Sequence, residues 1–438
     1  MKLPLAGLFF VALLARPAIA QTGAPPIATL PGYAPPLFLL APELTSVFQR
    51  PRPDYDRLGV RIGAFDLMPT AGLSESFDSN IFATRNNAAA DAVTTATPEL
   101  SVQSDWARHA AALDMRGQLK RYAIHRSENV NNGAIEGQGR IDIETGSYLA
   151  AIAGYVLQHE DRSSPDSRAD IKAPTEFSTA EAAARYIHDE GRLGLHADAA
   201  ATSYSFTNNA TAGGATIVEN DRNRIEYRGT LQAAYEILPT LPYRVFLRGT
   251  GNLRRYDAID QSQRAATGES ARRDSHGWEI DAGTSVKISN LVTGEIYAGY
   301  LEQTYQSHVF PSASGIGFGG EVLWTVTPLT SLRGAASRTI IETTLTGASS
   351  ASESSLSATV EHELLRNLLL AGSARYIRDE YQGISRTDDT VAATIGARLL
   401  VNQVWRATAE LSYANRLSTD AASHYQRVIA KLGLEAGF

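Results

Sequence analysis

The feature that most constrains this chain is an alternation that repeats from about residue 58 to residue 438. Segments of roughly ten to sixteen residues place apolar and polar side chains at successive positions, and turn-forming residues separate them. Residues 113–120, 225–236 and 405–413 show the pattern most clearly. Because successive side chains of a strand point to opposite faces, each segment is predicted to be a strand with one apolar and one charged face.

A soluble β-sandwich shows the same alternation, but three features favour a membrane barrel. The segments exceed the usual strand length of about five or six residues and match the roughly nine to eleven that cross a bilayer with tilt. The polar face carries many full charges, as a water-filled lumen does. The apolar face is rich in alanine, glycine and leucine rather than in bulky core residues. We therefore predict an all-β, transmembrane, antiparallel up-and-down β-barrel.

The connections between the segments alternate in length. Short turns are predicted around Asp105, Thr145, Asp189, Thr240, Pro328, Arg366 and Asn402. Longer polar loops are predicted at residues 78–91, 127–132, 160–173, 208–220, 258–275, 306–314, 347–353, 382–389 and 418–424. Short periplasmic turns and long extracellular loops are typical of outer-membrane barrels. Counting the segments gives about 18 strands, within a range of about 16–18, and an even number leaves both termini periplasmic.

The first 57 residues lack this alternation. Lys2, the apolar run at 3–15 and the small residues Ala18 and Ala20 predict a secretory signal peptide at 1–20, with a retained N-terminal helix as the alternative. The stretch at 21–57 is rich in proline, which fixes φ and lacks an N–H. It is predicted to be a periplasmic arm or a plug segment in the barrel mouth, and residues 58–438 to form the barrel.

Charge and composition argue against several other classes. The formal net charge of −7 becomes −9 when Lys2 and Arg16 leave with the signal peptide. This balance argues against a nucleic-acid-binding protein, which usually carries a basic excess on one face. No later stretch approaches the roughly eighteen consecutive apolar residues of a membrane-spanning helix. The chain has no cysteine, and a barrel closed by its own hydrogen bonds needs no disulfide.

Aromatic residues lie at the ends of the predicted strands. Trp106, Trp324, Trp405 and Tyr243 lie beside short turns, and Trp278 lies beside a long loop. Outer-membrane barrels place aromatic side chains where the apolar band meets the lipid head groups. Two aromatic girdles are therefore predicted.

The last segment ends on Phe438. Apolar residues occupy every second position back to Val428, and Arg427, Lys431 and Glu435 occupy the other parity. A final amphipathic strand with a terminal phenylalanine is the form that the bacterial barrel-assembly machinery is understood to recognise. Phe438 is therefore predicted to be an assembly signal, with an ordinary edge strand as the alternative.

Motifs for catalysis, metals and cofactors are scarce. His196 and Asp198 share a face near Thr202 and Ser203, but polar pairs are expected in any pore, so no catalytic residue is predicted. The sequence has no HExxH motif and no calcium-loop pattern, so no metal or cofactor site is predicted. The glycines at 315–320 resemble a dinucleotide-binding loop, but the strand pattern continues after them, which indicates strand glycines.

Charged clusters in the loops at 160–162 and 272–274 are interpreted as solvated surface. Binding of divalent cations or lipopolysaccharide at these loops is the alternative.

The charged parity of the strands is predicted to line a pore. The predicted lumen residues are Asp114, Arg116, Lys120, Glu226, Arg228, Arg244, Arg248, Glu279, Asp281, Arg375, Arg406, Glu410, Arg427 and Lys431. Such charges set ion preference. Arg244, Arg248 and Arg254 share one parity of one segment, where they form either a basic ladder for anionic solutes or ion pairs with neighbours such as Glu226, Glu236 or Glu279.

Several runs resemble one known family. The run at 51–84, PRPDYDRLGVRIGAFDLMPTAGLSESFDSNIFAT, is the most extensive, and HEDRSSPD, NDRNRIEY, TPLTSLRGAASRTIIETTLTGASS and HELLRNLLL follow it. They are similar to segments of the outer-membrane β-barrel porins common in alphaproteobacteria. The resemblance extends from about Arg50 to the end. It implies a barrel, a loose link to exopolysaccharide production and no catalytic residues.

These observations favour a porin of the outer membrane of a Gram-negative bacterium, which passes hydrophilic solutes or a polysaccharide. A non-conducting structural or assembly barrel is the alternative, and a hydrolase at the extracellular rim is a distant third. The expected partners are outer-membrane lipid, lipopolysaccharide and the barrel-assembly machinery. No nucleic acid is expected, and a homo-oligomer is compatible with the sequence.

Overall fold

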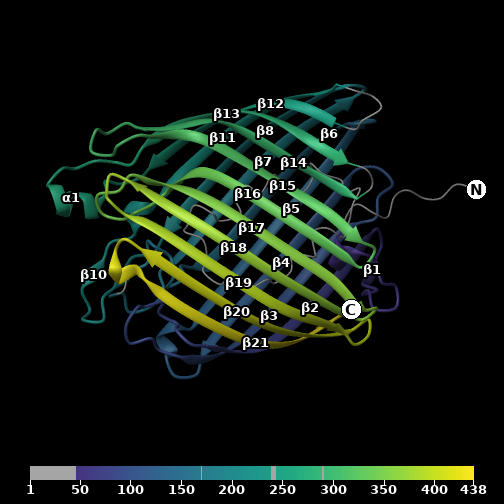
Figure 1. Ribbon diagram of the computed structural model, residues 1–438, viewed down its shortest axis with the longest axis horizontal. Helices are drawn as coiled ribbons and strands as arrows, with labels where there is room; N and C mark the ends of the chain where they lie inside the picture. Colours follow the sequence, from purple (N-terminus) through teal and green to yellow (C-terminus); the bar gives the residue numbers. More distant parts are fainter. Residues whose placement is uncertain (1–45, 169, 238–242, 289–290) are drawn as a thin grey trace, which may run out of the picture.

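The structure is a computed structural model that describes residues 46–168, 170–237, 243–288 and 291–438 (Figure 1). The predicted signal peptide at 1–20 and most of the predicted arm lie outside the described residues. Among the described residues, no helix is long and apolar enough to cross a membrane.

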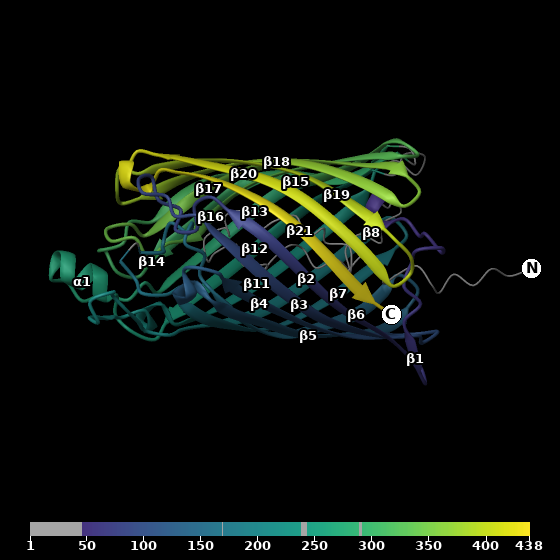
Figure 2. The ribbon, with the colours of Figure 1, turned by 90° about the horizontal axis from the view of Figure 1, so that it is seen from below.

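Eighteen long antiparallel strands form the wall of a closed barrel (Figures 1 and 2). They are β2 (Phe65–Asp78), β3 (Asp91–Ser104), β4 (Ala110–Tyr122), β5 (Val130–Glu144), β6 (Ser147–His159), β7 (Glu176–Glu190), β8 (Leu193–Phe206), β11 (Arg224–Glu236), β12 (Tyr243–Tyr256), β13 (Ser275–Ile288), β14 (Val292–Tyr305), β15 (Ala313–Thr327), β16 (Thr330–Glu342), β17 (Ser350–Leu365), β18 (Leu368–Gln382), β19 (Thr387–Leu400), β20 (Trp405–Ser418) and β21 (Tyr425–Gly437). Consecutive strands pair with each other, and β2 also pairs with β21, which closes the sheet. The predicted fold class is confirmed.

The remaining elements are short. They are β1 (Val60–Ile62), β9 (Asn209–Ala210), β10 (Thr216–Ile217), the helix α1 (Gln261–Thr267) and the 3-10 turns η3 (Val47–Gln49), η4 (Arg126–Glu128), η5 (Asn220–Arg222) and η6 (Ala421–Ser423). The first strand, β1, pairs with the start of β2, and α1 lies at the loop-bearing end of the barrel (Figure 1).

The alternation of the sequence decides which side of the wall each residue faces. On β11, Ile225, Tyr227 and Leu231 are exposed, whereas Arg224 and Thr230 at the other parity are buried. An exposed large apolar side chain is costly in water, and a bilayer around the wall removes that cost. The closed ladder pairs the backbone N–H and C=O groups of the wall, which lipid cannot satisfy.

The two ends of the barrel differ, as predicted. Short connections of the described chain at 105–109, 145–146, 191–192, 328–329, 366–367 and 401–404 gather at one end with the C-terminus, here called the turn end. Nine connections gather at the other end, here called the loop end, and all of them except 383–386 are longer than the turn-end connections: 79–90, 123–129, 160–175, 207–223, 257–274, 306–312, 343–349, 383–386 and 419–424. The predicted turn at Thr240 lies outside the described residues, and the break between β13 and β14 was not predicted.

The predicted girdle residues lie on the outer face. Trp106, Trp324 and Trp405 are each about two-fifths exposed at the turn end, and Trp278 is similarly exposed towards the loop end. The Trp106 ring meets Phe65 edge-on, with 5.6 Å between the centroids.

The glycines at 315–320 belong to β15, as the sequence interpretation expected. A Cβ at Gly319 would lie 2.4 Å from Cζ of Tyr297, and a Cβ at Gly317 would lie 2.7 Å from Leu301. These glycines therefore let large side chains of β14 lie flat against the inner face of β15.

Candidate functional site

The charged residues predicted to line the lumen all lie on the inner face of the wall. Each of the fourteen is adjacent in sequence to a large apolar residue that is exposed on the outer face. For example, Arg375 precedes the exposed Tyr376, and Lys431 precedes the exposed Leu432. Their role in a pore remains a prediction.

The three arginines of the expected basic ladder are paired with carboxylates. Arg248 lies 3.2 Å from Asp281 and 3.1 Å from Glu295. Arg244 lies 2.7 Å from Asp189. Of the two interpretations left open by the sequence, these contacts favour ion pairing, although with partners that sequence reasoning did not name.

Arg254 completes this set. It pairs with Glu342 and lies 3.9 Å from Glu226, the one carboxylate that the sequence analysis named correctly. Its side chain is 7% exposed. The inner face of β12 is therefore charged but largely neutralised.

Two lumen arginines are different. Within the described part of the chain, Arg116 and Arg375 are exposed on the inner face with no carboxylate within 4.0 Å. Arg375 donates a weak hydrogen bond to Ser355 Oγ, at 3.3 Å. Both guanidinium groups act electrostatically on a more distant carboxylate, Arg116 on Glu99 and Arg375 on Glu353.

The connection from β6 to β7, residues 160–175, spans the loop end and is here called the crossing loop. Asp166 accepts hydrogen bonds from Thr343 Oγ1 at 2.7 Å and from the Thr344 N–H at 2.8 Å. These two residues follow β16, which is eight strands from β6 in one direction round the barrel and ten in the other. The crossing loop therefore reaches almost the opposite side of the mouth.

Two further contacts hold the crossing loop to strands of the wall. Arg416 of β20 donates to the Ser163 carbonyl, and Arg427 of β21 lies 3.4 Å from Asp161. Burial raises the pKa of Asp161, but the positive charges of Arg427 and Lys120 lower it by more than burial raises it. The pKa of Asp161 therefore lies below its ordinary value. The Asp161 carboxylate is thus ionised near neutral pH and attracts Lys120 of β4 and Arg427 of β21.

The base of the crossing loop is held by two buried ion pairs. Arg162 donates to both oxygens of Glu128, at 2.7 and 2.8 Å, and Arg222 lies 2.9 Å from Glu160. Glu160 is only 4% exposed. The interpretation of the cluster at 160–162 as solvated surface was therefore wrong, because its charges are paired inside the mouth.

The cluster at 272–274 is also partly buried. Arg273 is 2% exposed and lies 2.6 Å from Asp260, and it donates to the Thr343 carbonyl at 2.7 Å. Its neighbour Arg272 is exposed, as expected for solvated surface. Arg273 thus ties the 257–274 loop to the end of β16.

The end of the β16–β17 hairpin, residues 339–349, points into the barrel and is here called the hairpin end. The pairing of β16 with β15 stops at Phe318 and Arg338, yet β16 continues to Glu342 in register with β17 alone. Ile340 packs in a buried cluster with Leu301 and Ala313. The hairpin end therefore lies against the inner face of its neighbours instead of extending their wall.

Glu342 anchors this hairpin end. Its carboxylate accepts hydrogen bonds from Tyr256 Oη at 2.7 Å and Tyr305 Oη at 2.8 Å, and it pairs with Arg254. All three partners lie on β12 or β14. The crossing loop and the hairpin end meet at Asp166, and a cavity of about 700 Å³ lies among the loops around them.

Residues 46–57, the part of the predicted arm that the structure describes, lie at the turn end. The Val47 N–H donates to Ser331 Oγ at 3.0 Å, and the Phe48 N–H donates to Glu361 at 2.9 Å. Arg52 lies 2.6 Å from Glu363, and both side chains are buried. Residues 46–52 therefore contact the inner face of β16 and β17, which is compatible with a plug segment.

Deleting residues 21–56 should raise the unit conductance of the barrel, because the deleted chain contacts the lumen wall. Single-channel recording in a planar bilayer measures this. A Glu361→Gln, Glu363→Gln double variant is the control of unchanged length, and it should give a smaller increase by weakening the same contacts. Conductance unchanged by the deletion would show that the arm does not narrow the passage.

The possible catalytic pair of the sequence does not form. His196 Nε2 faces Asp189 at 3.5 Å, and Asp198 pairs with Arg185. His196 lies near the start of β8, at the turn end rather than at the rim where the outer-membrane hydrolase alternative would place it.

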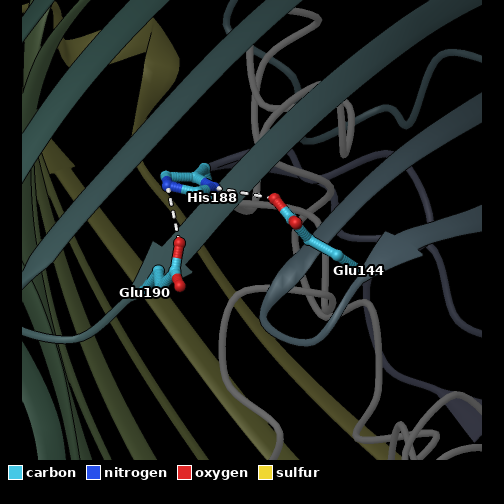
Figure 3. A group of neighbouring side chains, drawn as sticks. All are labelled: Glu144, His188 and Glu190. Atoms are coloured by element: carbon cyan, nitrogen blue, oxygen red, sulfur yellow. Dashed lines mark ion pairs between the residues drawn. The ribbon is translucent and has the colours of Figure 1, made fainter.

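One cluster of metal-ligand type lies at the turn end, formed by Glu144, His188 and Glu190 (Figure 3). Glu144 lies 3.9 Å from Nδ1 of His188, whereas Glu190 lies 3.8 Å from Nε2. Ser147 Oγ also contacts Nδ1, at 2.6 Å. One ligand atom from each residue lies within 4.8 Å of the other two, but both glutamates are largely exposed, and exposed acidic groups often gather without a metal ion.

The comparison with protein families agrees with this architecture. A family model described as "Putative beta-barrel porin 2" matches residues 52–438. The chain belongs to this family. The resemblance drawn from the sequence is thereby confirmed at the level of β-barrel porins, and the match covers the whole wall and the end of the arm.

Several solved outer-membrane proteins have a similar fold. The outer membrane protein OpdK of Pseudomonas aeruginosa has 9% sequence identity over 85% of this chain and 99% of its own, with a TM-score of 0.45. A mutant ferric enterobactin receptor, PfeA, of the same organism has 7% identity over 86% and 81%, with a TM-score of 0.47. The siderophore receptor PirA of Acinetobacter baumannii has 6% identity over 84% and 80%, with a TM-score of 0.45. A comparison with curated proteins found no match.

Proposed function

We propose that this porin-family barrel lies in the outer membrane and passes small hydrophilic solutes, without acting as an enzyme. The observation that carries the proposal is the continuous charged inner face, on which Arg116 and Arg375 are exposed with no carboxylate at ion-pair distance. A wall of this many strands encloses an aqueous channel unless something fills it. Charged groups on such a face are solvated by the channel water.

In this proposal the loop end is extracellular and the turn end is periplasmic. The long loops then meet lipopolysaccharide, and the solute enters through the cavity beside the crossing loop. Assembly depends on the last strand, whose end is held by the Phe438 N–H at 3.2 Å from the Pro69 carbonyl. Phe438 is itself exposed, as a residue read by assembly machinery must be.

A non-conducting barrel is the second candidate, because the crossing loop and the arm both contact the lumen. A polysaccharide is the alternative solute, and a threading polymer would have to displace the crossing loop. If reconstituted protein gave no current although its folding had been verified, the result would favour the non-conducting barrel and overturn the porin proposal.

Arg375→Glu should shift the channel towards cations, because it replaces an exposed positive charge on the inner face by a negative one. The shift is measured as the reversal potential in a salt gradient. Arg378→Glu is the matched control, since Arg378 is also exposed on β18 but faces outwards beside Asp389, at 3.5 Å. Equal shifts in the two variants would contradict a lumen role for Arg375.

A further inference from the structure

Two carboxylates lie side by side on the inner face without a basic side chain at ion-pair distance. Glu353 of β17 and Asp379 of β18 are directly opposed in the strand register. Each residue is only 3% exposed. Within the described part of the chain, no basic side chain lies within 4.0 Å of either carboxylate. Directly opposed residues of antiparallel strands have Cβ atoms about 5 Å apart, so both side chains enter the same space.

Each carboxylate also has one sealed oxygen that lacks a donor. Oε2 of Glu353 and Oδ1 of Asp379 are buried and have no hydrogen-bond partner among the described residues. A buried charge without a partner is strongly destabilising, because its desolvation is not offset. Two adjacent ones cannot both remain ionised without a compensating positive charge.

The neighbouring polar groups are already engaged. Asp388, which opposes Asp379 in the register, accepts from Arg386 at 2.6 Å, Ser418 Oγ at 2.6 Å and Tyr381 Oη at 3.3 Å. Arg416 on the next strand donates to the Ser163 carbonyl. No hydrogen bond from these groups reaches the two buried oxygens of the pair, which stay available to a ligand. The nearest guanidinium groups, those of Arg375, Arg386 and Arg416, act on the pair only from beyond 4.0 Å.

We propose that Glu353 and Asp379 bind a hard divalent cation such as Ca²⁺. Carboxylate oxygens are the ligands that Ca²⁺ prefers, and water completes its coordination. Two carboxylates make a weak site, of about 10⁻⁴–10⁻³ M, which is the range of extracellular calcium modules. The cation joins β17 to β18 next to the inward hairpin end, so it stabilises the loop end of the barrel.

The test is calorimetric titration of CaCl₂ into barrel refolded in detergent without lipopolysaccharide. Wild type should bind Ca²⁺, and a Glu353→Gln, Asp379→Asn double variant should lose that binding. Glu380→Gln is the matched control, because Glu380 is adjacent on β18 but pairs with Arg338 and Arg378 on the opposite side of the strand. It should bind as wild type does.

Thermal unfolding with Ca²⁺ or EDTA gives a second readout that does not depend on conductance. The proposal expects Ca²⁺ to raise the unfolding temperature of wild type and of Glu380→Gln, but not of the double variant. If the double variant does not fold, Glu353→Gln alone should weaken binding about tenfold or more, since one of two charged ligands is lost. The proposal would be overturned if wild type did not bind Ca²⁺, which would leave a proton shared by the two carboxylates as the explanation of the pair. It would also be overturned if the double variant still bound Ca²⁺, which would place the calcium site elsewhere.

Discussion

Replacing residues 163–168 of the crossing loop by a short Gly-Ser linker should raise the unit conductance several-fold. The removed residues include Asp166, which joins the crossing loop to the β16–β17 hairpin, and Ser163, which binds Arg416. Without them the crossing loop would no longer be held to the hairpin end, and the passage at the loop end would widen. Single-channel recording of wild type and variant at the same salt concentration measures the change.

The matched control shortens another loop of the same end. Residues 212–215 form an exposed tip of the 207–223 loop, so their removal should leave the conductance near that of wild type. A crossing-loop variant that is folded but conducts like wild type would show that the narrowest point lies elsewhere, with the arm as the next candidate.

Glu342→Ala should destabilise the barrel by about 3–5 kcal/mol, the range for removing one partner of a buried ion pair. Arg254 would lose its closest carboxylate, and the hydroxyls of Tyr256 and Tyr305 would lose their acceptor. Denaturant unfolding of the barrel in lipid vesicles measures the free energy of unfolding.

Two further variants separate the charge from the hydrogen bonds. Glu342→Gln keeps an acceptor for the tyrosines and should cost less than Glu342→Ala. Glu321→Ala removes the exposed partner of Arg333 and should cost about 0–1 kcal/mol, as exposed pairs do. If Glu342→Ala cost no more than Glu321→Ala, the hairpin end would be held by its apolar contacts rather than by Glu342.

The wall could be predicted from the sequence because one rule decides it. A period of two assigns every residue of a strand to a face, so residues such as Asp114 and Lys431 were placed on the inner face without knowledge of their neighbours. The aromatic residues at the strand ends and the unequal connections then set the orientation of the strands. The wall needs no contacts between distant parts of the sequence beyond the closure of β2 on β21.

The contents of the lumen could not be predicted in this way. The pairing of Arg248 with Asp281 and Glu295 depends on the strand register, which alternation alone does not determine. The crossing loop depends on contacts between residues far apart in sequence, such as Asp166 and Thr343, and its charges looked like those of a solvated loop. The acidic pair of Glu353 and Asp379 likewise emerges only when β17 and β18 are aligned.

The pairing of β2 with β21 has a consequence for biogenesis. The two strands that close the wall lie far apart in the sequence, so a folded chain that lacked either one would be an open sheet with two unpaired edges. Such a sheet can join edge to edge with another copy of the chain. Removal of the thirteen-residue strand β21 is therefore expected to produce aggregates rather than a smaller barrel.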